Sequence, residues 1–279
     1  MCFHSDRQFQ SLPELAHFPI KELDFSRVST FDPGAIKSFS LEAITLPVGC
    51  DFPLREFKLF PLRRFSALEC QATDFESLAI LPIEELSLSG SGVEQLSFTH
   101  SMPLMKLDLS KTEVLDLRPL SEKALEVLNL QNTKIDNLTP LSECPLSQIN
   151  LNQTVIENLE PLRGSPLVEL ELRKTRVEDL SPLMESPLER LFLPGSPIRS
   201  INPLTFCPIK YLNMIGLKLD DLSPLREMQL HTLCLSPLQL KSEDFAILKE
   251  LNLQCLVGPG DNSKQSIDQF INKYVQSNH

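Results

Sequence analysis

The chain has 279 residues, with 26 Lys and Arg against 37 Asp and Glu, and therefore a formal net charge of −11 at neutral pH. Because nucleic-acid binding needs a basic face, this balance argues against a nucleic-acid partner. Average usage of about 7% Gly and 5% Pro predicts roughly 20 and 14 of these residues, but the chain contains 9 and 22. The shortage of Gly argues against a Gly-rich phosphate-binding enzyme.

The apolar stretches of the chain are short. Charged residues and Pro interrupt them every few residues, so none reaches the ~20 apolar residues that a membrane-spanning helix needs. The first ten residues, MCFHSDRQFQ, lack the basic region and following apolar region that mark a secretory signal. On these grounds we expect a cytoplasmic protein without a membrane span.

A repeat of 21 residues occupies most of the chain. The first apolar residue of the repeat recurs at this interval in eleven successive units. These residues are Ile20, Leu41, Leu62, Ile83, Leu104, Leu125, Leu146, Leu167, Leu188, Ile209 and Leu230. A twelfth unit, LKELNL, is expected to begin at Leu248, only 18 residues after the eleventh. Since one unit cannot bury its own leucines, the units should stack into a solenoid.

Residues 1–19 precede the first unit and are expected to form a cap. Four apolar residues in this segment are available to cover the first predicted strand, namely Phe3, Phe9, Leu12 and Leu15. The first three units keep the apolar strand positions but lack the turn residues of the later units. This is usual for terminal repeats, which face a neighbour on one side only.

The middle units share the pattern L-x-x-L-x-L-x-x-T-x-V/I-x-x-L-x-P-L. In the unit that begins at Leu104, Leu107 and Leu109 alternate as a short strand requires. Thr112 follows, with a hydroxyl that can bond the backbone of the turn. Pro119 fixes φ and removes an N–H on the return segment. We therefore predict one parallel strand per unit, followed by an extended or 3₁₀ return rather than a long helix.

The sequence GPGDNSKQSIDQFINKYV follows the last unit. It predicts a turn and then a short amphipathic helix, because Ile267, Phe270, Ile271 and Tyr274 have helical spacing. The predicted domains are therefore an N-terminal cap, an array of about twelve repeats and a C-terminal cap, at residues 1–19, 20–254 and 255–279.

The repeat pattern resembles that of leucine-rich repeat proteins. The short unit is similar to the class found in internalins and leucine-rich phosphatase-regulatory subunits, and its Pro-Leu turns resemble those of bacterial arrays. The resemblance implies an α/β repeat solenoid with a parallel β-sheet on the concave face and extended or 3₁₀ turns on the convex face. One departure is regular, since Thr or Ser stands where the family usually has Asn. These residues are Ser91, Thr112, Thr133, Thr154, Thr175 and Ser196.

Residues that carry chemistry in other proteins are scattered here. The five His show no metal-ligand spacing, and none of the seven Cys belongs to a C-x-x-C motif. Cys144 and Cys207 occupy the same repeat position, which indicates packing. The signatures of nucleophile elbows, P-loops, Rossmann folds and kinases are absent. We therefore predict a protein that is not an enzyme, with no catalytic residues, no metal site and no cofactor.

Acidic residues recur on the return segments of the array. Because they stand between buried apolar positions, they should form a solvated stripe along the solenoid rather than a cation site. They are Asp116, Asp136, Glu157, Glu178, Asp179, Asp220 and Asp221.

The candidate binding surface is the concave sheet, where outward residues of successive strands form columns about 4.8 Å apart. The central column is polar from Asp24 to Glu171 and is expected to end at Cys234 and Asn252. At Phe192, aromatic and Arg side chains converge, as they do in binding hot spots. Packing under the C-terminal cap is the alternative explanation. The predicted partner-binding residues are Arg173, Arg190, Phe192, Tyr211, Asn213 and Ile215.

These observations predict a monomeric scaffold that binds another protein through its concave face. Two alternatives stay open. The chain is a regulatory or targeting arm of a longer signalling enzyme, such as a bacterial Ser/Thr kinase, or it is a surface adhesion array, as the likeness to internalins suggests. An enzyme domain elsewhere in a longer chain would identify the first, and an export signal would identify the second.

The spacing of the thiols predicts a reduced protein. Secreted leucine-rich repeat proteins commonly close their ends with paired cysteines, but the predicted N-terminal cap contains only Cys2. Thiol titration of protein denatured without reductant should therefore return seven free groups. Two or more disulfides would contradict the cytoplasmic prediction.

Overall fold

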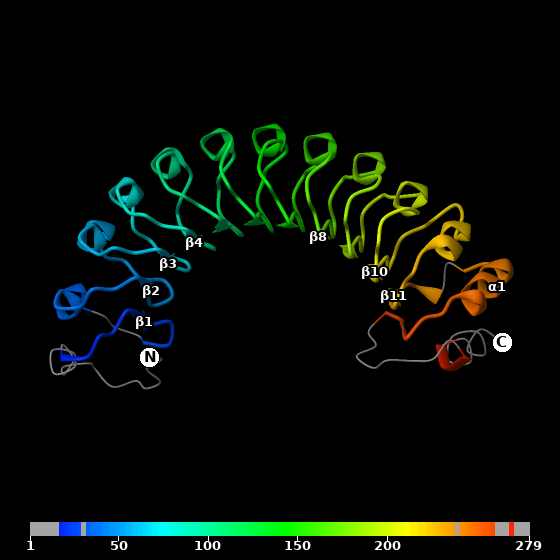
Figure 1. Ribbon diagram of the computed structural model, residues 1–279, viewed down its shortest axis with the longest axis horizontal. Helices are drawn as coiled ribbons and strands as arrows, with labels where there is room; N and C mark the ends of the chain where they lie inside the picture. Colours follow the sequence, from blue (N-terminus) through cyan, green and yellow to red (C-terminus); the bar gives the residue numbers. More distant parts are fainter. Residues whose placement is uncertain (1–16, 29–31, 238–239, 260–267, 271–279) are drawn as a thin grey trace. The chain divides into compact units, whose positions relative to one another are not determined.

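The computed structural model describes residues 17–28, 32–237, 240–259 and 268–270. The chain divides into two compact units, Met1–Ile135 and Asp136–His279. Both are built from one motif, in which a three-residue strand is followed by a turn, a short helix and a second turn. Within each unit, Figure 1 shows the strands along one side and the 3₁₀ helices along the other.

The strands of the first unit pair in parallel, each with the next along the chain. They are β1 (Glu22–Asp24), β2 (Ala43–Thr45), β3 (Arg64–Ser66), β4 (Glu85–Ser87), β5 (Lys106–Asp108) and β6 (Val127–Asn129). The register follows the period, so that Leu107 lies opposite Leu128. The 3₁₀ helices of this unit are η2 (Pro33–Ile36), η3 (Leu54–Phe57), η4 (Phe75–Leu78), η5 (Ser97–Thr99) and η6 (Arg118–Leu120).

The second unit repeats this arrangement and adds one α-helix, α1 (Ser242–Glu250). Its strands are β7 (Gln148–Asn150), β8 (Glu169–Glu171), β9 (Arg190–Phe192), β10 (Tyr211–Asn213), β11 (Thr232–Cys234) and β12 (Cys255–Val257), and they pair in parallel in this order. Its 3₁₀ helices are η7 (Thr139–Leu141), η8 (Glu160–Leu162), η9 (Ser181–Leu183), η10 (Asn202–Leu204) and η11 (Ser223–Glu227).

Each repeat buries the same apolar positions. In the repeat of β5, five of them are at most 2% exposed, namely Leu107, Leu109, Val114, Leu117 and Leu120. The return segment is a 3₁₀ helix with Pro119 in its first turn, as the missing N–H of Pro allows. The structure therefore confirms the predicted leucine-rich repeat solenoid, with parallel strands and 3₁₀ returns.

The regular Thr residues close the turns after β5, β6, β7 and β8. The hydroxyl of Thr112 donates to the carbonyl of Leu109 at 2.6 Å, and that of Thr133 donates to the carbonyl of Leu130 at 2.7 Å. A buried hydroxyl thus satisfies a backbone acceptor that would otherwise lose its water. Ser91 differs, because its buried hydroxyl has no hydrogen-bond partner among the described residues. The role expected of this position is confirmed for Thr but not for Ser91.

The last repeat differs from its prediction. We expected a unit starting at Leu248, with Asn252 in the central outward column. The structure instead places β12 after residue 254 and sets Val257 opposite Cys234. The predicted register is therefore wrong. The paired residues Thr232 and Cys255 are 23 positions apart, because the nine-residue helix α1 fills the return segment of this repeat.

The sequence contained a signal for α1 that the repeat pattern obscured. Glu243 and Asp244 stand in the first turn of the helix, where carboxylates interact favourably with free N–H groups. The Asp244 carboxylate accepts the backbone N–H of Lys241 at 2.7 Å. LKELNL looked like the start of a repeat, but its first residues belong to this helix.

Most of the two predicted caps lies outside the described residues, including Phe3, Phe9, Leu12, Leu15, Ile267, Ile271 and Tyr274. Residues 268–270 are helical, and Phe270 among them is fully buried. In the part of the chain that the structure describes, no helix has both the length and the apolar character needed to cross a membrane.

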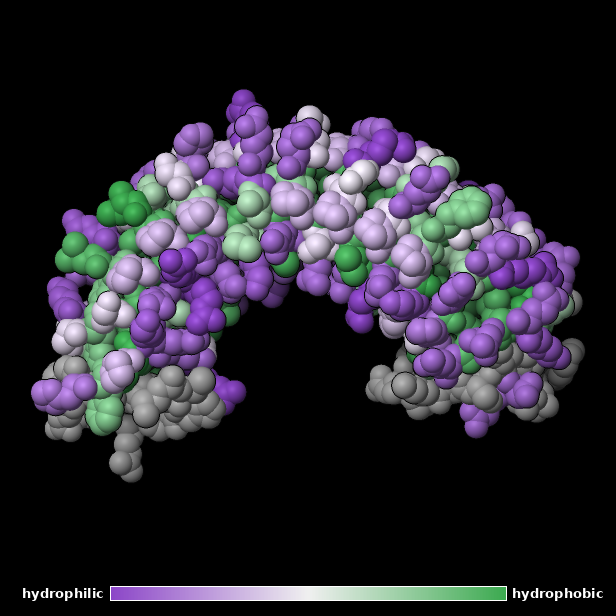
Figure 2. Space-filling model, viewed as in Figure 1, coloured by the Kyte–Doolittle hydropathy of each residue, from purple (hydrophilic) through white to green (hydrophobic). Residues whose placement is uncertain are grey.

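The 3₁₀ side of the first unit carries two exposed apolar side chains. Leu59 is 87% exposed and Ile80 is 72% exposed. Figure 2 shows hydrophobic residues among hydrophilic ones on the visible surface of this unit. Leu59 and Ile80 occupy the same position of adjacent repeats, after η3 and η4. The corresponding position in the repeat of η6 is Glu122. The repeat pattern did not predict this apolar pair.

The register can be tested by comparing a core position with a surface position. Leu128 is 1% exposed, so Leu128→Ala should lower the free energy of unfolding by about 2–5 kcal/mol. Glu157 pairs with Arg176 at 3.3 Å between exposed side chains, so Glu157→Ala should change it by less than about 0.5 kcal/mol. Denaturant titration of both variants measures the difference, and equal losses would contradict the assigned register.

Candidate functional site

The candidate site lies on the sheet face of the second unit, on β9 and β10. The strand register sets Arg190 beside Tyr211 and Phe192 beside Asn213. The residues between them, Leu191 and Leu212, point the other way and are fully buried. Four of the six predicted site residues are therefore cross-strand neighbours on one face.

Arg190, Phe192 and Tyr211 form a contacting group, here called the aromatic–Arg cluster. The ring centroids of Phe192 and Tyr211 are 4.9 Å apart, with a tilt of 35°. The guanidinium carbon of Arg190 lies 5.6 Å from the Phe192 centroid and 5.4 Å from the Tyr211 centroid, within cation–π range. Arg190 also forms an ion pair with Glu169 at 3.1 Å. Rings and guanidinium thus hold one another in a fixed arrangement.

The Tyr211 hydroxyl is neutral under physiological conditions. Burial of the phenol raises the pKa of Tyr211 to about 12, and the hydroxyl lies 3.5 Å from the Cys234 sulfur. Burial likewise raises the pKa of Cys234. The cluster therefore offers a neutral hydroxyl that can donate a hydrogen bond beside a permanently charged guanidinium.

The other predicted site residues have different surroundings. Asn213 is buried, and its side-chain oxygen accepts the backbone N–H of Ile215 at 3.2 Å, so it shapes the turn after β10. Arg173 is exposed in the turn after β8, where its backbone N–H donates to Asn152 Oδ1 at 2.7 Å. Ile215 is half-buried. The structure thus brings together Arg190, Phe192 and Tyr211, with Asn213 as a supporting residue.

Most polar residues of the central column have a structural role that sequence reasoning missed. Their side-chain oxygens accept the backbone N–H two residues further on, over 2.8–3.2 Å. These residues are Asp24, Asp108, Asn129, Asn150 and Asn213. Such short polar side chains stabilise turns. Phe192 occupies the same position but cannot make this bond, so its type is not explained by the turn.

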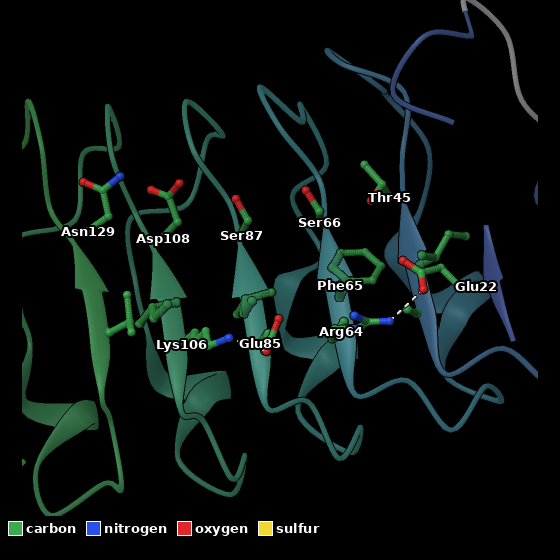
Figure 3. Close-up of a pocket in the computed structure, with 15 residues that line it drawn as sticks. Glu22, Thr45, Arg64, Phe65, Ser66, Glu85, Ser87, Lys106, Asp108 and Asn129 are labelled. Atoms are coloured by element: carbon green, nitrogen blue, oxygen red, sulfur yellow. Dashed lines mark hydrogen bonds and ion pairs between the residues drawn. The ribbon is translucent and has the colours of Figure 1, made fainter. Parts of the chain in front are cut away.

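A groove on the sheet face of the first unit was also missed. Figure 3 shows it across β1–β6, and its volume is about 460 Å³. Thr45, Ser66 and Ser87 stand in the central column there, in place of the longer turn-forming residues. Their short side chains leave space on the outward face of the sheet, while Phe65 between Arg64 and Ser66 is buried in the core. Three successive hydroxyl residues in one column are the sequence signal that would have found this groove.

Two ion pairs form the charged wall of this groove. Arg64 bonds Glu22 at 2.8 Å, across the small side chain of Ala43, and Lys106 bonds Glu85 at 2.8 Å. All four charged side chains remain substantially exposed. Exposed pairs of this kind contribute little to stability, so they remain open to rearrangement by a partner.

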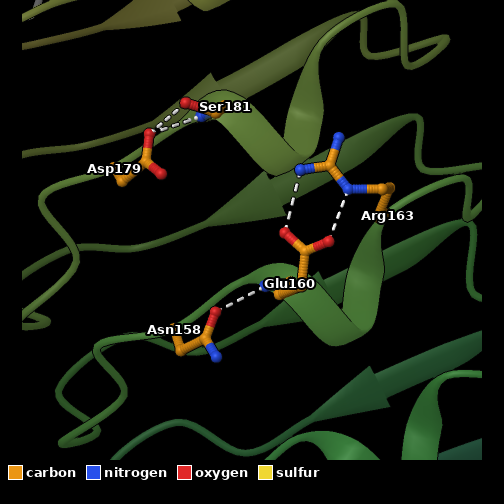
Figure 4. A network of polar contacts seen from close by, with 5 residues as sticks. All are labelled: Asn158, Glu160, Arg163, Asp179 and Ser181. Atoms are coloured by element: carbon orange, nitrogen blue, oxygen red, sulfur yellow. Dashed lines mark hydrogen bonds and ion pairs between the residues drawn. The ribbon is translucent and has the colours of Figure 1, made fainter.

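Part of the predicted acidic stripe caps the 3₁₀ helices. Asp179 accepts the backbone N–H of Ser181 at 2.8 Å, and Asn158 accepts that of Glu160 at 2.8 Å (Figure 4). Glu160 in turn pairs with Arg163 at 2.6 Å. Hydrogen bonds from the Ser181 hydroxyl and N–H hold the pKa of Asp179 below its usual value. Among the described residues, no group of three or more acidic, His or Cys side chains is arranged to hold a metal ion.

The capping role of Asp179 gives a stability prediction. Asp179→Ala removes the acceptor for the Ser181 N–H and should lower the free energy of unfolding by about 0.5–1 kcal/mol. Asp179→Asn should keep most of the bond. Glu178→Ala removes an exposed side chain next to Asp179 and should have little effect on the free energy of unfolding. Denaturant titrations at pH 7 compare the three.

The same residue predicts a pH dependence. Because the folded-state pKa of Asp179 is lowered, its contribution is present above the unfolded pKa and is lost as the pH falls through the folded pKa. The difference in the free energy of unfolding between the wild type and Asp179→Ala should therefore become smaller at acidic pH. A difference that stays constant down to strongly acidic pH would contradict the charged cap.

No protein-family model matches the chain, and the search of curated proteins found no match. Among solved structures, an internalin from Listeria monocytogenes is similar, with 22% identity and a TM-score of 0.69, over 93% of this chain and 85% of that one. Internalin C2 from the same organism has 22% identity and a TM-score of 0.53, over 74% and 84%.

A plant protein is also similar. It is the leucine-rich repeat ectodomain of a membrane receptor kinase from Arabidopsis thaliana, in complex with CASPARIAN STRIP INTEGRITY FACTOR 2. Its identity is 18% and its TM-score 0.60, over 83% of this chain and 31% of that one. At these identities the likeness shows the leucine-rich repeat fold.

Proposed function

We propose that this chain is a scaffold that binds a protein partner through the sheet face of its repeats. The observation that carries the proposal is the aromatic–Arg cluster of Arg190, Phe192 and Tyr211. Phe192 replaces the turn-forming or small polar side chains of the central column, and Arg190 and Tyr211 stand beside it in the neighbouring column, where the fold requires no aromatic residue. Contact of these half-buried rings with water is unfavourable, and another surface that covers them would remove this cost.

The chemistry of the cluster fits a protein surface. Tyr and Arg are enriched at the centres of interfaces, because a rigid ring and a planar guanidinium bury large area with little loss of conformational freedom. Half of the Arg190 side chain is still exposed above the rings. A partner that offers an apolar anchor to Phe192 and Tyr211 and a carboxylate to Arg190 satisfies both parts. The plant ectodomain that shares the fold has its partner bound, which supports this use of the fold.

The proposal further makes the chain a non-enzymatic monomer in a bacterial cytoplasm. The net charge of −11 supports a protein rather than a nucleic-acid partner. Cys50, Cys70, Cys207, Cys234 and Cys255 are free thiols, which agrees with a reducing compartment. A surface adhesion array is the second candidate function, since two internalins share the fold. Localisation of the native protein in its source cell distinguishes a cytoplasmic scaffold from a surface adhesion array.

Truncation of the aromatic rings tests the proposal. Affinity capture from source lysate should retain a protein on the wild type that is lost on Phe192→Ala/Tyr211→Ala. With that protein purified, each single truncation should weaken binding by more than about 1–2 kcal/mol, because a hot-spot ring loses its covered area. The melting transition should stay nearly unchanged, since neither ring belongs to the repeat core.

Gln148→Ala is the matched control, because Gln148 is an exposed residue of β7 in the same column as Tyr211. Asp108 and Ser87 are less suitable, since Asp108 closes a turn and Ser87 lines the groove of the first unit. The control should bind as the wild type does. If the ring variants melt early but bind normally when folded, the cluster packs against the cap and the proposed site is wrong.

A further inference from the structure

The 3₁₀ side of the first unit has a pocket beside Leu59. Residues that follow η2, residues of η3 and the turn after η3 line it, and its volume is about 270 Å³. An apolar cavity of ~150 Å³ already holds a benzene ring, so this pocket has room for one bulky side chain. It faces away from the sheet and is therefore distinct from the groove and from the aromatic–Arg cluster.

Two aromatic rings form the base of this pocket. Phe39 and Phe60 occupy the same position of adjacent repeats, and they are the most deeply buried residues of the lining. The ring centroid of Phe60 lies 6.3 Å from that of Phe57, which is fully buried in the repeat core. The core therefore holds the base of the pocket in place before anything binds.

Exposed apolar side chains extend the pocket on one side. Leu59 lines the pocket, and Ile80 occupies the same position of the next repeat, where η4 packs against η3. Both side chains are largely exposed. The middle repeats carry polar residues or Gly at this position, namely Ser101, Glu122, Glu143, Gly164 and Glu185. The fold therefore does not require an apolar residue here, and the contact of Leu59 and Ile80 with water indicates a surface that another molecule covers.

The rim of the pocket has the opposite charge to the chain as a whole. Three cationic side chains, Lys37, Arg55 and Lys58, line it with one carboxylate, Glu56, whereas the chain has a net charge of −11. Lys37 is paired with Glu56 at 3.3 Å, and Arg55 lies 4.0 Å from Asp74. Lys58 is exposed and forms no ion pair with any residue that the structure describes. A carboxylate of a partner can therefore pair with Lys58 without breaking an existing ion pair.

We propose that this pocket binds a segment of a protein partner in which a bulky apolar side chain stands next to an acidic residue. The apolar side chain fills the pocket above Phe39 and Phe60, and the neighbouring carboxylate pairs with Lys58. The segment also covers Leu59 and Ile80, and the removal of their apolar surface from water favours binding. The site lies outside the sheet face, so it does not depend on the function proposed for the aromatic–Arg cluster.

The charges around the pocket favour a protein segment over a membrane or a second copy of the chain. Glu56 in η3 and the exposed Glu76 in η4 share this side of the unit with the cations. An anionic bilayer would contact these carboxylates together with the lysines, and their repulsion would offset the attraction. A segment can instead place one carboxylate at Lys58. Two copies of a chain with a net charge of −11 repel each other.

Peptide selection on the full-length protein tests this site. A phage-displayed library of random peptides is first depleted on Leu59→Ser, which keeps the aromatic–Arg cluster, and is then selected on the wild type. We expect the enriched peptides to share a bulky apolar residue beside Asp or Glu. The probe is one enriched peptide, labelled with fluorescein, and its binding is measured by fluorescence anisotropy. Ile80→Ser should weaken binding about threefold or more, because the peptide covers less apolar surface.

A charge reversal tests the role of Lys58. Lys58→Glu should weaken binding of the peptide about threefold or more, and replacement of the acidic residue of the peptide by Lys should restore binding to this variant. Leu115→Ser is the matched control, because Leu115 is an exposed leucine of the same unit that does not line the pocket. This control and Phe192→Ala/Tyr211→Ala should bind the peptide as the wild type does, so failure at the cluster and failure at this pocket are distinguishable.

Three results would overturn the proposal. The first is a selection that enriches no peptide, or only peptides without the apolar–acidic pair. The second is binding to Lys58→Glu that equals binding to the wild type. The third is a different occupant, detected as co-sedimentation with vesicles of phosphatidylcholine and phosphatidylserine, or as a dimer in analytical ultracentrifugation, that Leu59→Ser abolishes. Because Leu59, Lys58 and Ile80 are exposed, their variants should melt as the wild type does.

Discussion

The parallel pairing of each strand with the next strand along the chain, 21 residues further on throughout the regular repeats, is the interaction on which the rest of the structure depends. A three-residue strand gains few hydrogen bonds alone, and the leucines of one repeat cannot bury themselves. Pairing solves both problems, since Leu109 donates its N–H to the carbonyl of Asn129 at 2.9 Å while Leu107 and Leu128 pack inward together. Every repeat must therefore place the same residue types at the same distance along the chain.

This constraint makes each column of side chains informative. Where the central column holds Asp or Asn, the side chain closes the turn after its strand, and its type is explained by the fold. Where the column holds Phe192, no such bond forms and the residue needs another explanation. Contact with Tyr211 and Arg190 makes that residue part of a surface rather than part of a turn. The candidate site is thus recognised as the place where a residue of the central column does not close a turn as the Asp and Asn residues do.

The period was enough to predict the strands, the solenoid and the hydroxyl of Thr112, because these follow from spacing and residue type alone. It was not enough for features that depend on neighbouring repeats. The turn after most strands has a left-handed residue, and Lys111 and Gln153 adopt this conformation with φ of 58° and 59°, although it costs a residue other than Gly on the order of 1 kcal/mol. The surrounding pairing imposes that conformation on Lys111 and Gln153, whereas Gly90, Gly195 and Gly216 at the same position of other repeats adopt it without this cost.

The candidate site was predictable to a similar extent. Strand alternation placed Arg190, Phe192 and Tyr211 on one face, but the tilt of the rings and the thiol beneath Tyr211 are properties of packing. The error at the last repeat has a local cause. The segment that looked like the start of a repeat forms α1 instead, because the acidic residues of its first turn and its apolar face both favour a helix.

A solenoid also limits how far a local change acts. Since each repeat contacts only its neighbours, a change in the repeats of β2 and β3 leaves the pairing of β9 with β10 as it was. The aromatic–Arg cluster keeps its geometry through that pairing and through the Glu169–Arg190 ion pair on the neighbouring strand. The packing of the first unit and the surface at β9 and β10 are therefore separate properties of one chain, and each can be altered by substitution without loss of the other.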